Sequence, residues 1–171
     1  ANFEAYLEAN GMGDGISGNN LVTTANISGV TVLDVWGESI SDLTGIEDFT
    51  ALTDLICRNN FLTSLDVSQN TALEDLKCQN NSLDSLDLSQ NADLTDLNCN
   101  NNDLTSLDVR NGNNSSLTTF QCTGNALLLC IDVSDTASAT VGGWSIDLGA
   151  SFSLNCATAF GCTVPVACNY D

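Results

Sequence analysis

The sequence predicts a repeat solenoid of the α/β class that is mostly β, in which short coils stack to form a parallel sheet along a curved, concave face. Two observations predict this architecture. A pattern that reads L-x-x-L-x-C-x-x-N-x-L-x-x-L-D-V-S-x-N-x-x returns every 21 residues along the middle of the chain. Within the pattern, L-x-C and L-D-V alternate with period two, and paired asparagines interrupt each unit, which favours strands and turns over helices.

The repeat units follow one another along the chain. One unit covers 52–72, the next covers 73–93, and a third begins at Leu94. A fourth begins at Leu117 after a two-residue insertion, and a 22-residue unit of a different kind, 30–51, precedes them. A period in the low twenties with leucines and an asparagine at these positions is the leucine-rich-repeat signature. The predicted organisation is an N-terminal cap (1–29), the repeats (30–134), a C-terminal cap (135–158) and a tail or the start of a further module (159–171).

A cysteine takes the place of one leucine in each unit. The strands should point these residues into the core as a cysteine ladder, formed by Cys57, Cys78, Cys99 and Cys122. Parallel in-register side chains keep their Cβ atoms about 4.8 Å apart, beyond the ~3.5–4.5 Å of a disulfide, so we predict free buried thiols. A linear column also cannot surround one ion tetrahedrally, which argues against a zinc site.

A second ladder is expected where the chain leaves each strand. It consists of Asn60, Asn81, Asn102 and Asn125, whose amides can bond the backbone of the buried turns. On the opposite wall, the "LDVS" segments should point leucine and valine inward and their aspartates outward. This outward row comprises Asp66, Asp87, Asp108 and Asp132. Water, salt and neighbouring serines are expected to relieve the like charges, and calcium along the row is the alternative.

Caps are expected at both ends, because a solenoid exposes its core there. Phe3, Tyr6 and Leu7 lie at i, i+3, i+4 spacing before Asn10-Gly11, which predicts a short helix over the first coil. A turn is expected at "GDGISGNN", because this segment lacks the full acidic spacing and the closing glutamate of a calcium loop.

The opposite end carries its own signals. Strands that close over the last coil are expected in "GGWSIDLGASFSLNC". Cys130 and Cys156 are the natural pair to staple this cap, which would add a few kcal/mol of stability.

The outward strand positions line the concave sheet, where we expect a ligand. Two of the three basic residues, Arg58 and Lys77, fall on this face close to Trp36. An exposed tryptophan beside arginine is typical of protein interfaces, whereas tryptophan with amides and carboxylates suits a sugar. The alternative is that Trp36 packs against the N-terminal cap while Arg58 and Lys77 offset the aspartates. The candidate ligand-binding residues are Trp36, Asp54, Ile56, Arg58, Asp75, Lys77, Gln79, Asp96, Asn98 and Asn100.

Composition excludes several function classes. The 22 acidic residues against 3 basic ones, a net charge of −19, argue against binding to nucleic acid or anionic lipid. No apolar run approaches the ~20 residues of a membrane span. The chain has no histidine, its acidic pairs belong to the repeat frame, and its ladder cysteines have no base. We therefore predict a monomer that is not an enzyme and needs no cofactor.

Several segments resemble a known family. The unit containing "ISDLTGIEDFTALTDL" resembles the internalin-type leucine-rich repeat, and the cysteine-bearing units resemble the cysteine-ladder repeats of the internalin J type, found in secreted and surface proteins of Bacteroidetes. "NFEAYLEANGMGDG" resembles the cap that precedes such repeats. The resemblance covers roughly 30–134 and implies an exported or surface-displayed domain for adhesion or protein recognition, without catalysis.

The C-terminal "GCTVPVACNYD" resembles the "GCTDPTACNYD" modules of Bacteroidetes secreted proteins, which usually have a further downstream cysteine. This resemblance implies a Cys162–Cys168 disulfide. With Cys130 and Cys156, these cysteines indicate an oxidising compartment.

The sequence thus predicts an extracellular or cell-surface module that recognises a protein through its concave face. The alternatives are glycan binding in support of polysaccharide attachment or use, and a spacer without a ligand. An ice-binding surface is disfavoured, because the candidate rows carry aspartate and mixed polar residues and not an array of threonines.

Overall fold

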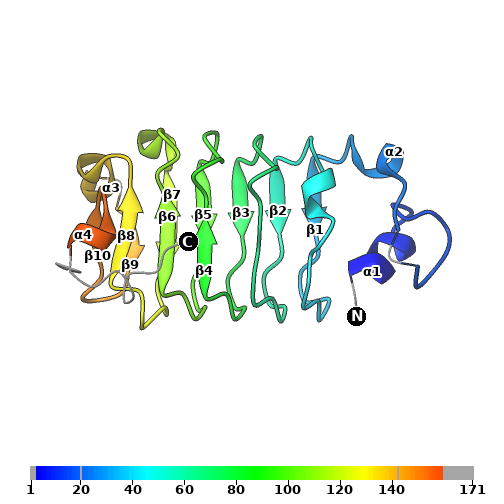
Figure 1. Cartoon of the computed structure of the whole chain (residues 1–171), viewed down its shortest axis with the longest axis horizontal. Helices are drawn as coiled ribbons and strands as arrows, with labels where there is room; N and C mark the ends of the chain where they lie inside the picture. Colours follow the sequence, from blue (N-terminus) through cyan, green and yellow to red (C-terminus); the bar gives the residue numbers. More distant parts are fainter. Residues whose placement is uncertain (1–2, 20, 142, 160–171) are drawn as a thin grey trace.

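The computed structural model describes residues 3–19, 21–141 and 143–159. These residues wind into one elongated solenoid with a helical segment at its N-terminal end (Figure 1). The first parallel sheet, which we call the long sheet, contains β1 (Val32–Asp34), β2 (Asp54–Ile56), β3 (Asp75–Lys77), β5 (Asp96–Asn98), β7 (Thr119–Cys122) and β9 (Ser145–Ile146), in that order. The predicted mostly-β solenoid is confirmed.

The second parallel sheet, the short sheet, forms the opposite wall. Its order is β10 (Ser151–Ser153), β8 (Cys130–Val133), β6 (Ser106–Val109) and β4 (Ser85–Asp87). From 73 onward, each coil therefore gives one strand to each sheet. Since both walls repeat at the strand spacing of about 4.8 Å, the solenoid has little reason to curve strongly toward either wall.

The helices are short and lie at the ends or corners of the solenoid. They are α1 (Phe3–Ala9), α2 (Thr24–Ile27), α3 (Thr136–Val141) and α4 (Cys156–Ala159), with the 3₁₀ turns η1 (Ile46–Asp48) and η2 (Asn114–Ser116). In the described part of the chain, no helix has the length and apolarity needed to cross a membrane.

The core is built from inward-facing leucines that stack in register. Leu55 pairs with Leu76, Leu76 with Leu97, and Leu97 with Phe120, and all four are buried. The cysteine column lies beside them as four buried free thiols. Burial raises the pKa of the Cys57 thiol to about 12, so very little of it is thiolate at neutral pH.

The predicted asparagine ladder joins one coil to the next. Asn102 is representative: its Nδ2 donates to Cys78 O at 3.2 Å and to Cys99 O at 3.1 Å, and its Oδ1 accepts from Leu83 N at 3.1 Å. Asn60, Asn81 and Asn125 bond backbone groups of their own coil and of the preceding coil in the same way. Each amide thus satisfies buried backbone groups in two coils at once.

A further ladder was not predicted from the sequence. Asn70 and Asn91 are fully buried at the corner after the short-sheet wall, and Asn111 is nearly so. Asn91 Nδ2 donates to Val67 O at 3.1 Å and to Asn70 O at 2.9 Å, and Asn111 Nδ2 continues to Asn91 O at 3.0 Å. The available signal was the asparagine that ends each "VSQN", "LSQN" and "VRN" segment.

The N-terminal cap covers the first coil as predicted. Phe3 and Leu7 are buried, and the rings of Phe3 and Phe49 lie 6.0 Å apart. The segment after α1 turns back on itself, with Asp14 Oδ1 accepting from Ile16 N at 2.9 Å and Glu8 Oε1 accepting from Asp14 N at 2.8 Å. The carboxylates of Glu8 and Asp14 therefore hold the backbone of this turn by hydrogen bonds.

The strands predicted to close over the last coil instead extend both sheets. Ser145 of β9 pairs in parallel with Gln121, and Ser151 of β10 pairs with Cys130. The space inside this last, irregular coil is filled by aromatic rings, with Phe120 and Trp144 stacked at 4.4 Å. The coil continues because its backbone can still pair in register, although the leucine pattern has ended.

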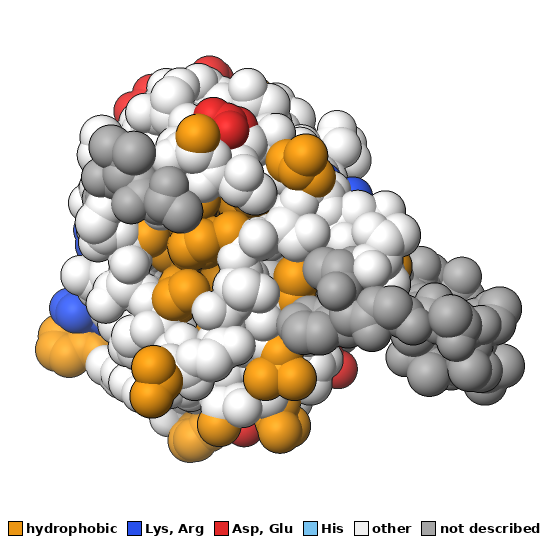
Figure 2. Space-filling model, turned by 90° about the vertical axis from the view of Figure 1, so that its left-hand side faces the viewer, with side chains coloured by type: hydrophobic (Ala, Val, Ile, Leu, Met, Phe, Trp, Pro, Cys, Tyr) orange, Lys and Arg blue, Asp and Glu red, His pale blue; other side chains and the backbone are white. Residues whose placement is uncertain are grey.

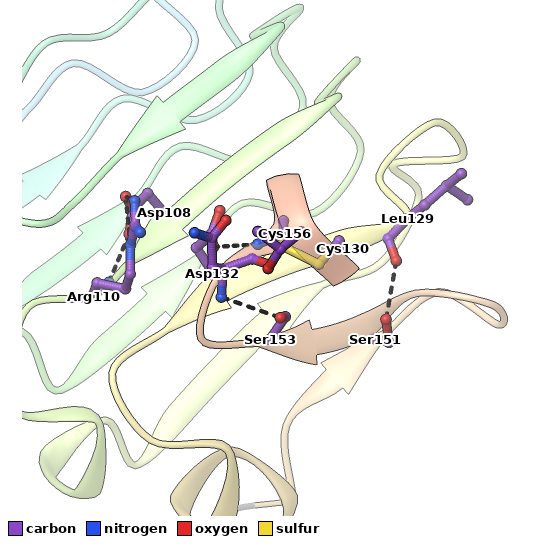
Figure 3. The surroundings of a disulfide bond; sticks show 10 residues. Asp108, Arg110, Leu129, Cys130, Asp132, Ser151, Ser153 and Cys156 are labelled. Carbon is purple, nitrogen blue, oxygen red and sulfur yellow. Dashed lines mark hydrogen bonds and ion pairs between the residues drawn. A yellow bond between two sulfur atoms is a disulfide. The ribbon is translucent and has the colours of Figure 1, made fainter. Parts of the chain in front are cut away.

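The predicted Cys130–Cys156 disulfide is present, with Cα atoms 5.7 Å apart (Figure 3). The prediction that Asp132 points into solvent is wrong. Asp132 is 9% exposed, and its Oδ1 accepts a hydrogen bond from Cys156 N at 2.7 Å. The disulfide brings α4 onto this wall, so Asp132 is buried beneath α4. The implied Cys162–Cys168 pair lies outside the described residues.

The C-terminal end of the solenoid is apolar. Figure 2 faces this end and shows hydrophobic side chains gathered in and around a central hollow. The exposed hydrophobic residues of the last coils are Leu127, Leu129, Leu148 and Leu154.

We expect the ladder thiols not to react with a thiol reagent in the native protein. In a Cys162→Ser/Cys168→Ser variant, Ellman's reagent without reductant should detect no thiol under native conditions and four in denaturant. The reason is that all four thiols are buried, and burial raises the pKa of Cys57 to about 12. Six thiols in denaturant would contradict the Cys130–Cys156 bond, and fewer than four would mean cross-linked ladder cysteines.

Replacing one ladder asparagine should destabilise the whole stack. Asn102→Ala leaves Leu83 N–H and two carbonyls without their partner. We expect a loss of about 1–3 kcal/mol in urea unfolding, because unsatisfied buried polar groups are costly. The matched control is Asp103→Ala, which alters the exposed neighbouring side chain and should change stability by less than about 0.5 kcal/mol. Equal losses for the two variants would contradict the role given to the ladder.

Candidate functional site

The outward residues of the long sheet form rows that run across the coils. The strand register gives the first row as Val32, Asp54, Asp75, Asp96 and Thr119, and the second as Asp34, Ile56, Lys77, Asn98 and Gln121. Backbone hydrogen bonds between neighbouring coils continue beyond the strand ends and align a third row, Trp36, Arg58, Gln79, Asn100 and Thr123. The candidate ligand-binding residues therefore lie on one face.

Trp36 and Arg58 contact one another at the N-terminal end of this face. The Arg58 guanidinium carbon lies 4.9 Å from the centre of the Trp36 ring, a cation–π arrangement. Trp36 is nevertheless 54% exposed. The tryptophan is therefore held in place by a neighbouring coil while much of its ring surface remains accessible.

Lys77 is engaged within the face. Its Nζ forms an ion pair with Asp75 Oδ2 on the same strand, and its side chain is only partly exposed. This geometry agrees with the alternative expectation that Lys77 offsets the aspartate row. The other carboxylates of that row accept from threonine hydroxyls, Asp54 from Thr53 and Asp96 from Thr95.

Several polar atoms on this face are buried without a hydrogen-bond partner. They are Arg58 Nε, Asp75 Oδ1 and Gln79 Oε1, which come from two neighbouring coils. Such atoms lose water on folding without compensation, which is unfavourable. Within the described chain, the remaining atoms of this kind belong to the interior asparagines, Asn70 and Asn91. Within the described residues, the unsatisfied polar atoms of the surface thus belong to Arg58, which contacts Trp36, and to the coil that follows Arg58.

The face is better satisfied toward the C-terminal end. Asn98 Nδ2 donates to Gln121 Oε1 at 2.8 Å, and Asn100 Oδ1 accepts from Thr123 N at 2.6 Å. Both side chains are therefore already bonded to the next coil. Of the candidate residues, those near Trp36 therefore have more unmet bonding capacity than Asn98 and Asn100.

A hollow of about 540 Å³ lies between the N-terminal helix and the start of the long sheet, and we call it the α1 hollow. Its lining residues are Ala5, Tyr6, Ala9, Asn10, Asp34, Trp36 and Glu38. The Tyr6 hydroxyl donates to Asp34 O at 2.5 Å and fixes α1 against the sheet. The volume falls within the ~300–1,000 Å³ typical of ligand sites.

The sequence interpretation missed most of this hollow. It placed Trp36 on the face but treated Tyr6 as a packing residue, used Asn10 only as part of the helix stop and did not consider Glu38. The available signal was the i, i+4 spacing of Tyr6 and Asn10. The position of α1 relative to the sheet was needed to connect them with Trp36.

The potential in the α1 hollow is negative. The pKa of Tyr6 is raised above its ordinary value of 10.0, first by burial and then by the negative charges of Asp34 and Glu38. Asp34 Oδ1 also accepts from Trp36 N at 3.0 Å, which keeps its carboxylate beside the tryptophan.

The aspartate row of the short-sheet wall holds backbone turns. Asp66, Asp87 and Asp108 each accept from the backbone N–H two residues later, at 2.8 to 2.9 Å. These bonds lower the pKa of Asp66, the bond from Ser68 N being the largest cause. Asp108 also forms an ion pair with Arg110 (Figure 3). Among the residues that the structure describes, no three His, Cys, Asp or Glu side chains are grouped to hold a metal.

Comparison with known proteins bears on this architecture. No family model matches the chain. Over 49 residues the chain is 47% identical to Internalin J of Listeria monocytogenes serotype 4b (strain F2365), a match that covers 29% of this chain and 5% of that protein. A solved structure described as the functional domain of InlJ from Listeria monocytogenes, including a cysteine ladder, is 33% identical with a TM-score of 0.51.

The structural match covers 66% of this chain and 32% of the solved chain. The chain thus spans about a third of the solved domain and a small fraction of the curated protein. The structural match agrees with the buried cysteine column and the stacked coils, and the fold is of the cysteine-ladder type.

The charge of the α1 hollow can be measured through Tyr6. In a Tyr170→Phe variant, ultraviolet titration should show Tyr6 ionising above pH 10, and Asp34→Asn/Glu38→Gln should lower that pKa without abolishing the shift caused by burial. Since folding raises this pKa, its contribution to stability is complete below pH 10 and is lost as pH rises through the folded value. A pKa that the double variant leaves unchanged would contradict the negative potential.

Proposed function

Because the chain is an internalin-like cysteine-ladder leucine-rich-repeat domain, we propose that it is a recognition module that binds another protein through the long sheet, at the end where Trp36 lies. The observation that carries the proposal is the exposed Trp36 held by Arg58 beside the α1 hollow. Tryptophan and arginine are the residues most enriched at the energetic centres of protein interfaces.

The unpartnered polar atoms support the same location. In the free protein, three buried polar atoms have no hydrogen-bond partner: Arg58 Nε, Asp75 Oδ1 and Gln79 Oε1. A partner that enters between their side chains and supplies hydrogen bonds removes an existing cost, so binding there gains more than at a satisfied surface. The better-paired amides around Asn98 would then form the rim of the interface.

We also propose that the domain acts outside the cell or on its surface. The Cys130–Cys156 disulfide favours an oxidising compartment. The ladder thiols can survive there because all four are buried, and burial raises the pKa of Cys57 to about 12. The same burial leaves them without the exposure that a catalytic nucleophile needs, so we propose no enzymatic role.

A glycan ligand is the second candidate. The favouring observation is the α1 hollow itself, in which the exposed Trp36 ring stands near the Tyr6 hydroxyl and the Asn10 amide. Aromatic faces stack on sugars while amides and carboxylates bond hydroxyl groups. Such a ligand would depend on Trp36 and little on salt, whereas a protein held by charged groups would respond to both.

The proposal predicts that a Trp36→Ala/Arg58→Ala/Lys77→Ala variant loses its partner. The labelled domain and this variant would be tested against separated surface proteins and a glycan array. We expect a protein ligand whose affinity falls at least tenfold in the variant, since truncating central interface residues typically costs about 2 kcal/mol or more.

The matched control is Phe61→Ala/Arg110→Ala, which removes an exposed aromatic ring and a basic side chain from elsewhere on the solenoid. Binding should be retained in this control. A protein that binds the triple variant as well as the original domain would contradict the long-sheet interface. Binding to glycans alone, lost with Trp36→Ala, would replace the first candidate by the second.

A further inference from the structure

The α1 hollow combines groups that attract cations. Two aromatic side chains, Tyr6 and Trp36, line it together with the carboxylates of Asp34 and Glu38 and the amide of Asn10. Aromatic faces attract cations through their negative quadrupole, and carboxylates accept charge-assisted hydrogen bonds. None of the described residues that line the hollow is a lysine or an arginine.

The protein already contains a contact between a guanidinium and the Trp36 ring. The guanidinium of Arg58 lies over the Trp36 ring at 4.9 Å, yet Arg58 does not line the hollow, and 54% of Trp36 remains exposed. The ring therefore accepts a guanidinium from the neighbouring coil while it presents further surface to the hollow. A second guanidinium on the hollow side would be favoured by Asp34 and Glu38, which outnumber Arg58.

The surrounding surface is acidic. Along the long sheet the carboxylates are Asp34, Glu38, Asp54, Asp75 and Asp96, whereas the cations are Arg58 and Lys77. Lys77 is paired with Asp75, so its positive charge offsets that carboxylate and has little effect on the others. After burial, Asp34 and Glu38 are the further causes that raise the pKa of Tyr6, so both carboxylates act on the hollow. Charge complementarity thus calls for a positively charged partner.

A metal ion suits this lining less well than an organic cation. Hard cations take six or more oxygen ligands in a compact shell, whereas tryptophan and alanine side chains form part of these walls. One oxygen of Asp34 already accepts from the Trp36 N–H. A flat guanidinium can instead stack on an aromatic ring and bond a carboxylate at its edge.

We propose that the α1 hollow receives a positively charged side chain, arginine in the best case, from the protein that the long sheet binds. This inference rests on the proposed function and names the chemistry of the partner. The arginine would stack on the exposed part of Trp36 and donate to Asp34 and Glu38. The preferred partner therefore presents a basic segment at the N-terminal end of the long sheet.

The two tryptophans make a direct test possible. Trp36 lines the hollow, whereas the Trp144 indole N–H donates to Leu117 O at 3.1 Å near the other end of the solenoid. In ¹⁵N-labelled protein, acetyl-arginine amide should shift the indole signal of Trp36 and leave that of Trp144 unchanged. Acetyl-citrulline amide, which has nearly the same shape without the charge, should shift neither at the same concentration.

Isosteric variants locate the charge. Asp34→Asn/Glu38→Gln keeps an oxygen that can accept from the Trp36 N–H and should weaken binding of the arginine probe roughly tenfold. Asp48→Asn is the matched control, since Asp48 lines a different hollow beside α1 and its loss should leave Trp36 responsive. Higher salt should weaken the binding, because part of it is electrostatic.

Each outcome is decisive for the inference. Equal shifts with the citrulline probe, a Trp36 signal that does not respond to the arginine probe, or unchanged binding in Asp34→Asn/Glu38→Gln would overturn it. A protein partner lost in the Trp36→Ala/Arg58→Ala/Lys77→Ala variant but bound normally by Asp34→Asn/Glu38→Gln would also overturn it, while the proposed function would stand. A selective shift of Trp36 supports it whether or not a partner has been found.

Discussion

The structure depends on one constraint. Every coil has corners whose backbone N–H and C=O groups are buried, and these groups must find hydrogen-bond partners away from water. Buried asparagines meet this requirement at two corners, through Asn102 and its equivalents on one side and through Asn70, Asn91 and Asn111 on the other. Asn102 and its equivalents bond the backbone of two coils, and Asn91 and Asn111 bond the backbone of the preceding coil, so the ladders fix the spacing between coils as well as the shape of each turn. The leucine and cysteine columns can then stack without gaps.

This regular spacing decides the character of the long sheet. A repeated aspartate in each unit becomes a row of carboxylates one strand spacing apart, which is unfavourable unless partners are supplied. Lys77 and the threonine hydroxyls beside Asp54 and Asp96 supply some of them. The row that begins with Trp36 has fewer of its hydrogen bonds made, because Arg58 Nε and Gln79 Oε1 are buried without a partner. The candidate site thus arises where the repeat places polar groups without giving all of them partners.

The ends of the solenoid differ in what they do with the exposed core. At the N-terminal end, α1 covers the first coil and leaves a polar hollow beside Trp36. At the C-terminal end, an irregular coil continues both sheets, is held by a disulfide, and presents leucines at the surface. The first arrangement combines charge, aromatic surface and a cavity, so it has the chemistry of a specific site. The second offers apolar surface whose partner nothing in the structure identifies.

The sequence by itself determined the repeating part of this protein. The 21-residue period and the period-two alternation were enough to predict the solenoid, the buried thiol column and the ladder of Asn60, Asn81, Asn102 and Asn125, because each coil repeats the geometry of its neighbour. Tertiary structure alone decided the burial of Asp132 under α4, the continuation of both sheets by β9 and β10, and the α1 hollow. Each of these depends on how a non-repeating segment packs against the stack. Such a segment inherits no register from its neighbours, so its position follows from contacts distant in sequence.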